Sequence, residues 1–201
     1  MRIKMIFRQI TPTRRNIQRN VSNYQAHRND LSIDFLKRCG YCNGVDLYRT
    51  SPFEIDHFIP RKRDKKPFLT IKTETDYSNL IYACKSCNNA KSNKWPTNNE
   101  SVSHENDEGF IDPCDVLYEQ QFHRLQNGQI RATTKLGLWM LKELKLDKPQ
   151  HEIIYNLEQL DSIIDQIVPN LEKLEDIDIS KRINCLLLKY RAYIRQLGRT
   201  S

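Results

Sequence analysis

The segments CGYC (residues 39–42), EIDHFIPR (54–61) and SNLIYACKSCNNAKSNKW (78–95) decide the fold of this chain. They contain two Cys-x-x-Cys pairs, an Asp-His pair, and an Asn-x-x-Lys that follows the last cysteine. Residues 53–58 alternate in a way that predicts a short strand, and the apolar run at 80–83 predicts a second strand, antiparallel to the first. No glycine or proline occurs from Asn88 until Pro96, which predicts a helix that ends there.

The two cysteine pairs have the spacing of a structural zinc site, which needs four converging thiolates: Cys39, Cys42, Cys84 and Cys87. The first residues lack the apolar region of a secretory signal, so we expect a cytoplasmic protein. In that compartment thiols stay reduced, and paired cysteines bind metal rather than form disulfides. Cys114 and Cys185 have no partner at ligand spacing, and we expect plain thiols at both positions.

A second set of candidate ligands has oxygen donors. The Asp56 carboxylate and the Asn88 amide suit Mg²⁺ or Mn²⁺, and Glu54 shares the strand face of Asp56. His57 is a candidate general base, because an imidazole can take a proton from water near neutral pH. Lys91 follows Asn88 on the same helical face and is a candidate phosphate contact. Singly, these residues also fit a surface pair and a helix cap, so the combination carries the interpretation.

This combination resembles the HNH endonucleases, the family of ββα-metal nucleases. The resemblance covers residues 39–95: Asp56-His57 on the first strand, Asn79 before the second strand, and Asn88 with Lys91 on the helix. The third letter of the motif is Asn rather than His, a variant common in the family, as is a four-cysteine zinc site. The resemblance implies an α+β fold with a ββα-metal core, followed by a mainly α-helical C-terminal region.

The same resemblance implies roles for the motif residues. His57 would activate water, and Asp56 with Asn88 would hold one catalytic Mg²⁺ or Mn²⁺ that polarises the scissile phosphate and stabilises the leaving 3′ oxygen. Asn79 would hold the motif loop and orient His57. Asn89 is the alternative to Asn88 as a ligand.

Positive charge gathers in the N-terminal half of the chain. The net charge is +7, and residues 1–38 contain nine Lys/Arg against two Asp/Glu, whereas residues 98–201 contain 13 against 17. This asymmetry suits a polyanionic partner, which the HNH resemblance implies is DNA. A solvated basic surface is the alternative. The candidate contacts to the nucleic-acid backbone are Arg14, Arg15, Arg61, Lys62, Arg63, Lys65, Lys66 and Lys91.

We expect four regions: a basic arm with a short helix (1–38), the nuclease core (39–97), a linker or insertion with a hairpin (98–132), and a helical region (133–201). Asn127-Gly128 predicts the hairpin turn, whereas residues 97–109 are typical of an exposed linker. Apolar residues at helical spacing predict three helices, over 134–146, 151–167 and 180–197. No run approaches the roughly 18 apolar residues that a membrane helix needs.

The order of arm, zinc-bearing core and helical tail also resembles the HNH subunit of Septu-type anti-phage defence systems, which works beside an ATPase. This resemblance implies an antiviral role, with the acidic helical tail as the docking surface for an ATPase partner. The sequence leaves two other functions open. One is a non-catalytic, zinc-dependent nucleic-acid-binding module, and the other is an RNA-cleaving toxin.

Overall fold

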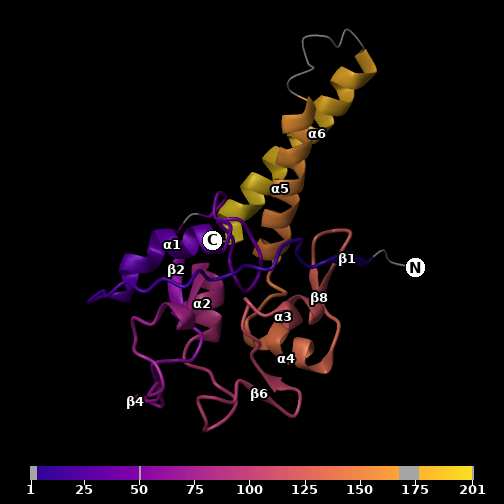
Figure 1. Cartoon of the computed structure of the whole chain (residues 1–201). Coiled ribbons are helices and arrows are strands. Elements are labelled where there is room, and N and C mark those ends of the chain that lie inside the picture. The colour runs from indigo at the N-terminus through magenta and orange to yellow at the C-terminus, as the bar shows by residue number, and fades with distance from the viewer. Residues whose placement is uncertain (1–3, 50, 168–176, 201) are drawn as a thin grey trace.

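The computed structural model describes residues 4–49, 51–167 and 177–200. Two long helices lie side by side and project from a body of short helices and small sheets (Figure 1). In chain order, the elements are β1 (Lys4–Ile6), the 3-10 helix η1 (Tyr24–His27), α1 (Arg28–Asp34), β2 (Glu54–His57), β3 (Lys62–Arg63), β4 (Lys66–Pro67), the 3-10 helix η2 (Tyr77–Asn79), β5 (Leu80–Ala83), α2 (Lys85–Lys91), β6 (His104–Glu105), β7 (Glu108–Gly109), α3 (Val116–Gln120), β8 (Phe122–Leu125), β9 (Ile130–Ala132), α4 (Lys135–Glu143), α5 (Pro149–Ile167) and α6 (Ile177–Thr200).

Strands β2 and β5 form the predicted antiparallel pair, and α2 packs against β2. The register sets Glu54 opposite Ala83 and His57 opposite Leu80. The predicted limits of the helix are wrong at both ends. It begins at Lys85, directly after Cys84, so the second cysteine pair is built into its first turn. It ends before Ser92, whose φ of 50° is incompatible with a continuing α-helix.

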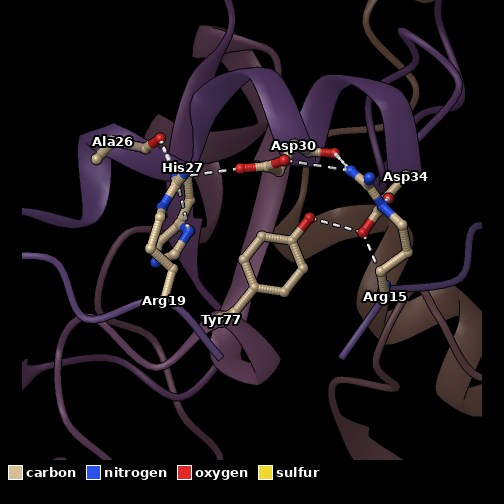
Figure 2. Close-up of polar contacts among 7 residues, drawn as sticks. All are labelled: Arg15, Arg19, Ala26, His27, Asp30, Asp34 and Tyr77. Atoms are coloured by element: carbon tan, nitrogen blue, oxygen red, sulfur yellow. Dashed lines mark hydrogen bonds and ion pairs between the residues drawn. The ribbon is translucent and has the colours of Figure 1, made fainter. Parts of the chain in front are cut away.

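The N-terminal arm is tied to the body rather than solvated. Its strand β1 pairs with β8, which also pairs with β9, giving a three-stranded sheet of order β1-β8-β9. Figure 2 shows how α1 anchors the part of the arm that follows β1 and contains Arg15 and Arg19. The backbone N–H of Arg15 donates to Asp34 Oδ2 at 2.8 Å, and Arg19 Nη2 donates to Asp30 Oδ2 at 3.1 Å. The hydroxyl of Tyr77 donates to the same Asp34 oxygen at 2.6 Å, which links the arm to the motif region.

The segment expected to be an exposed linker contains a small hairpin. Strands β6 and β7 pair through Asn106 and Asp107, both with positive φ, as a two-residue hairpin turn requires. The predicted second hairpin is confirmed as β8 and β9, with Gly128 at φ 88° in its turn. The three C-terminal helices are also confirmed as α4, α5 and α6, and α5 begins at Pro149, a favoured first helical residue.

One large apolar core joins the motif region to the segments on either side of it. Buried residues from the arm (Phe7), from β5 in the motif region (Ile81) and from α4 (Met140) belong to this single cluster. A smaller cluster sits between α5 and α6 and includes Ile154 and Leu197. None of the described helices combines the length and the apolar composition needed to cross a membrane.

Candidate active site and zinc centre

The structure brings the four cysteines together at one buried point. The Sγ atoms of Cys39, Cys42, Cys84 and Cys87 all lie within 4.8 Å of one another. The Cys42 and Cys84 sulfurs are 3.9 Å apart, close to the roughly 3.8 Å edge of a tetrahedron with Zn–S bonds of about 2.3 Å. Burial raises the pKa of the Cys39 and Cys87 thiols, whereas hydrogen bonds from the neighbouring thiols lower the pKa of Cys42. A bound cation would allow all four to be thiolates together. The donor set therefore fits zinc.

Residues from outside the two cysteine pairs surround this centre. The backbone N–H of Cys84 donates to Cys39 Sγ at 3.3 Å, and Arg49 Nη2 donates to Cys42 Sγ at 3.6 Å. His151 Nε2, at the start of α5, lies 4.0 Å from Cys87 Sγ and is buried. The sequence did not predict that Arg49 and His151 lie here, because neither is spaced from the cysteines as metal-ligand motifs are.

The face of β2 that meets α2 carries the predicted oxygen ligands. Asn88 Nδ2 donates to Glu54 Oε2 at 2.6 Å, so these two side chains meet across the strand–helix interface. Asp56 is buried and accepts a hydrogen bond from the Tyr41 hydroxyl at 2.5 Å through Oδ2. Burial raises the pKa of Asp56, against the opposing effects of Lys91 and Tyr41.

Lys91 is directed into the protein, which contradicts its predicted phosphate contact. Its side chain is 0% exposed, and Nζ lies 3.6 Å from Asp56 Oδ2. Nζ also donates to the backbone oxygen of His57 at 3.0 Å and lies over the Phe110 ring. The ammonium therefore compensates a buried carboxylate and fixes the end of β2. Helical spacing had placed Lys91 beside Asn88 without showing which way the shared face points.

His57 leaves β2 on the opposite face from Asp56. Its Nε2 lies 2.8 Å from the backbone oxygen of Glu74, and its ring packs edge-on against Tyr24 at 4.7 Å between centroids. A carbonyl oxygen only accepts, so Nε2 carries the proton and, in the neutral ring, Nδ1 keeps its lone pair. Burial lowers the pKa of His57, so the neutral, proton-accepting form prevails at pH 7.

Asn79 ties together the loop that follows His57. Its Oδ1 accepts from the backbone N–H of Ile59 at 2.9 Å, and its Nδ2 donates to the backbone oxygen of Ile59 at 3.0 Å. Its own backbone oxygen accepts from Phe58 at 2.8 Å. These three bonds hold the chain directly after the candidate base; that Asn79 thereby orients His57 stays a prediction.

The candidate nucleic-acid contacts divide into buried and exposed groups. Arg14 makes a bidentate ion pair with Asp112 and is only 11% exposed, which contradicts its predicted role. Arg15 is half exposed but pairs with Asp34. The loop around β3 and β4 keeps its charge at the surface, although Arg61 pairs with Glu74 and Arg63 lies over Phe68. The exposed lysines of this loop are Lys62, Lys65 and Lys66.

The two remaining thiols are not part of the four-cysteine cluster. Cys114 is half-buried, and burial raises its pKa to about 11. Cys185 is exposed on α6. Asn89, the alternative ligand, is exposed next to Asn88 on α2.

The comparison with known families identifies the core. Residues 39–94 match the model of the family described as HNH endonuclease. The chain therefore contains an HNH endonuclease domain over these residues, decorated with a four-cysteine, zinc-type cluster. No curated protein and no solved structure matches the chain.

Proposed function

We propose that this protein is a metal-dependent endonuclease that hydrolyses phosphodiester bonds in DNA. The observation that carries the proposal is the state of His57 within an HNH domain. Its Nε2–H is engaged by the Glu74 carbonyl, so Nδ1 is the proton acceptor. A neutral, buried imidazole held in one tautomer is the form that a general base requires at neutral pH.

Asp56 and Asn88 would hold the catalytic ion, Mg²⁺ or Mn²⁺, with Glu54 beside them. Hard oxygen donors on the facing surfaces of β2 and α2 fit such an ion. When bound, the ion would supply charge stabilisation at the scissile phosphate and the leaving oxygen. Asp56 Oδ2 is already held by Tyr41 and Lys91, so we propose Oδ1 as the donor to the metal. Lys91 and Asn79 are then positioning residues rather than groups that touch the substrate.

Plasmid nicking tests this function. With Mg²⁺, the wild type should convert supercoiled plasmid to open circles, and chelation should abolish the conversion. His57→Ala should reduce the rate by about 10² to 10⁴, the usual contribution of a positioned base, with DNA binding retained. His104→Ala is the matched control, because His104 is exposed on β6. Equal rates for His57→Ala and the wild type would sink the proposed mechanism.

One observation favours a second function, a zinc-dependent module that binds nucleic acid without cutting it. Asp56 is buried and already compensated by Lys91, an arrangement that is complete without a catalytic ion. This function predicts that the wild type binds DNA but cuts neither plasmid, single-stranded DNA nor tRNA with Mg²⁺ or Mn²⁺. The same three substrates separate DNA cleavage from RNA cleavage.

We further propose a place in a Septu-like antiviral system, with an ATPase partner docked on the projecting helices. The support is the resemblance in the order of arm, core and helical tail. By sequence, α5 has four carboxylates and no Lys or Arg, whereas α6 has six Lys/Arg and one carboxylate. We therefore place the proposed acidic docking surface on α5 rather than on the whole helical tail. Co-purification from the native host should recover an ATPase, and Asp165→Lys on α5 should weaken its recovery.

A further inference from the structure

A cation-lined pocket lies beside the zinc centre, and Cys84 is one of its lining residues. It has a volume of about 320 Å³ and lies between α2, the segment before β2 and the turn from α4 to α5, with Leu197 of α6 at one side. Three lysines from two of these elements reach it: Lys85 from α2, and Lys145 and Lys148 from the α4–α5 turn. All three are exposed, so their charge is available at the pocket mouth.

No described carboxylate neutralises the charge of these three lysines. Of the described residues that line the pocket, none is an Asp or Glu, and no ion pair joins any of the three lysines to a described carboxylate. The Lys148 ammonium instead donates to the hydroxyl of Ser86, a residue of α2, at 3.3 Å. Like charges gathered without a counter-ion repel one another, so a bound anion would relieve this cost.

Two buried donors in the pocket also lack partners. Arg49 Nε and Gln150 Nε2 are buried and make no hydrogen bond, and both residues line the pocket. Arg49 does engage the zinc centre, but through Nη2 on Cys42. A buried donor without an acceptor is destabilising, because it has lost its hydrogen bonds to water. An anion with several acceptor oxygens would accept hydrogen bonds from the unused N–H groups and balance the charge of the ammonium groups.

We infer that this pocket binds a phosphodiester of the nucleic-acid substrate, to one side of the bond that is cut. The inference rests on the proposed function. Helix α2 supports the choice of occupant, because its Asn88 faces Glu54 while Lys85, Ser86 and Asn89 face the pocket. A strand whose scissile phosphate lies at Asn88 therefore has further phosphates close to the pocket. Such contacts are independent of sequence and add to affinity and register.

Duplex binding, measured by fluorescence anisotropy of a labelled 30-base-pair DNA without added Mg²⁺, tests the inference. The double variant Lys145→Ala/Lys148→Ala should bind about tenfold more weakly near 100 mM salt, with a salt-dependence slope smaller by about 2. Lys37→Ala/Lys189→Ala removes the same charge from exposed positions outside the pocket, and we expect less than a twofold change. Equal losses in the two double variants would overturn the inference.

Gln150→Leu separates binding from folding. It removes a buried donor that has no partner, so the melting temperature should be unchanged or higher. DNA affinity should nevertheless fall, because the phosphate loses a hydrogen bond. Unchanged affinity in Gln150→Leu would count against the pocket as a phosphodiester site.

Two further outcomes separate this inference from its alternatives. If inorganic phosphate stabilises the wild type but not Lys145→Ala/Lys148→Ala, while both bind DNA equally, the pocket holds a free anion and the nucleic-acid assignment is wrong. If the wild type binds DNA and the lysine variant does not, but neither cuts with Mg²⁺, the pocket stands and the endonuclease function falls. A wild type that binds no nucleic acid overturns both.

Discussion

Lys91 illustrates how one residue changes role once its direction is known. Its ammonium is 0% exposed and lies 3.6 Å from Asp56 Oδ2. Lys91→Met should therefore leave a buried carboxylate uncompensated and lower the free energy of unfolding by about 3 kcal/mol or more. Urea denaturation measures this loss. A phosphate contact predicts the reverse pattern, with normal stability and weaker DNA binding.

A double-mutant cycle isolates the pair. Asp56→Asn removes the buried charge, so Asp56→Asn/Lys91→Met should recover much of the stability that Lys91→Met loses. Recovery is expected because burial raises the pKa of Asp56 and lowers that of Lys91, which means that both charges are costly in this place. Strictly additive losses would show that the two groups do not interact.

His57 gives the pH dependence of the proposed reaction. Burial, and to a lesser extent the charge of Arg61, lower its pKa below the ordinary 6.5. A lower pKa keeps the imidazole neutral to lower pH, so the acid limb of the nicking rate should have its midpoint below 6.5. Rates from pH 5 to 8 at saturating Mg²⁺ measure it. Arg61→Ala should move the midpoint upward, whatever it does to the absolute rate, and a wild-type midpoint above 6.5 would contradict the assignment.

At the scale of elements, α4 contains a glycine whose substitution should reverse the usual helix preference. Alanine in a helix is ordinarily favoured over glycine by about 1 kcal/mol. At Gly137, however, a Cβ would lie 2.3 Å from the backbone oxygen of Gln121. Gly137→Ala should therefore lower stability by about 1–3 kcal/mol. Gly198→Ala on α6 is the matched control, because its Cβ would meet nothing within 4 Å, and it should stabilise. Thermal melting of both variants decides the comparison.

The elements also show what the sequence could and could not predict. Strand β2 was predictable from its alternating pattern, and β5 from a short continuous apolar run. The β8–β9 turn was predictable because Asn127-Gly128 is a specific turn signal. The start of α2 was missed because Cys84, whose side chain makes no capping hydrogen bond, precedes it. The pairing of β1 with β8 was missed because it joins a three-residue strand to a four-residue strand more than a hundred positions away.

The candidate site divides in the same way. Motif spacing correctly brought the four cysteines to one point, because each Cys-x-x-Cys unit is local. Spacing alone could not distinguish arginines that bind a polyanion from arginines that hold the fold, as Arg14 does through Asp112. That distinction depends on acidic partners brought close only by folding. For the same reason the sequence did not indicate the role of Tyr41, which lies between Cys39 and Cys42 and donates a hydrogen bond to Asp56.

At the scale of the whole molecule, the four-cysteine centre joins the HNH domain to the projecting helices. Cys84 directly precedes α2, whose fourth residue is Asn88, and Cys87 contacts His151 of α5. The Arg38–Glu158 ion pair and the Tyr48–Asp161 hydrogen bond add to the attachment of α5. Loss of zinc should therefore loosen both α2 and the base of α5.

Cys84→Ala tests this coupling, because zinc binding supplies folding free energy in such sites. The variant should lose zinc, be largely unfolded at 37 °C, and nick no plasmid. Cys185→Ala, at an exposed cysteine, should stay within about 0.5 kcal/mol of the wild type. Hydrogen exchange on zinc-stripped wild type should show faster exchange in α2 and in the first turns of α5, with slower change in β8 and β9. If α5 keeps its protection without zinc, the helices are anchored by their apolar contacts alone, and a soluble, fully active Cys84→Ala protein would refute the structural role of the metal.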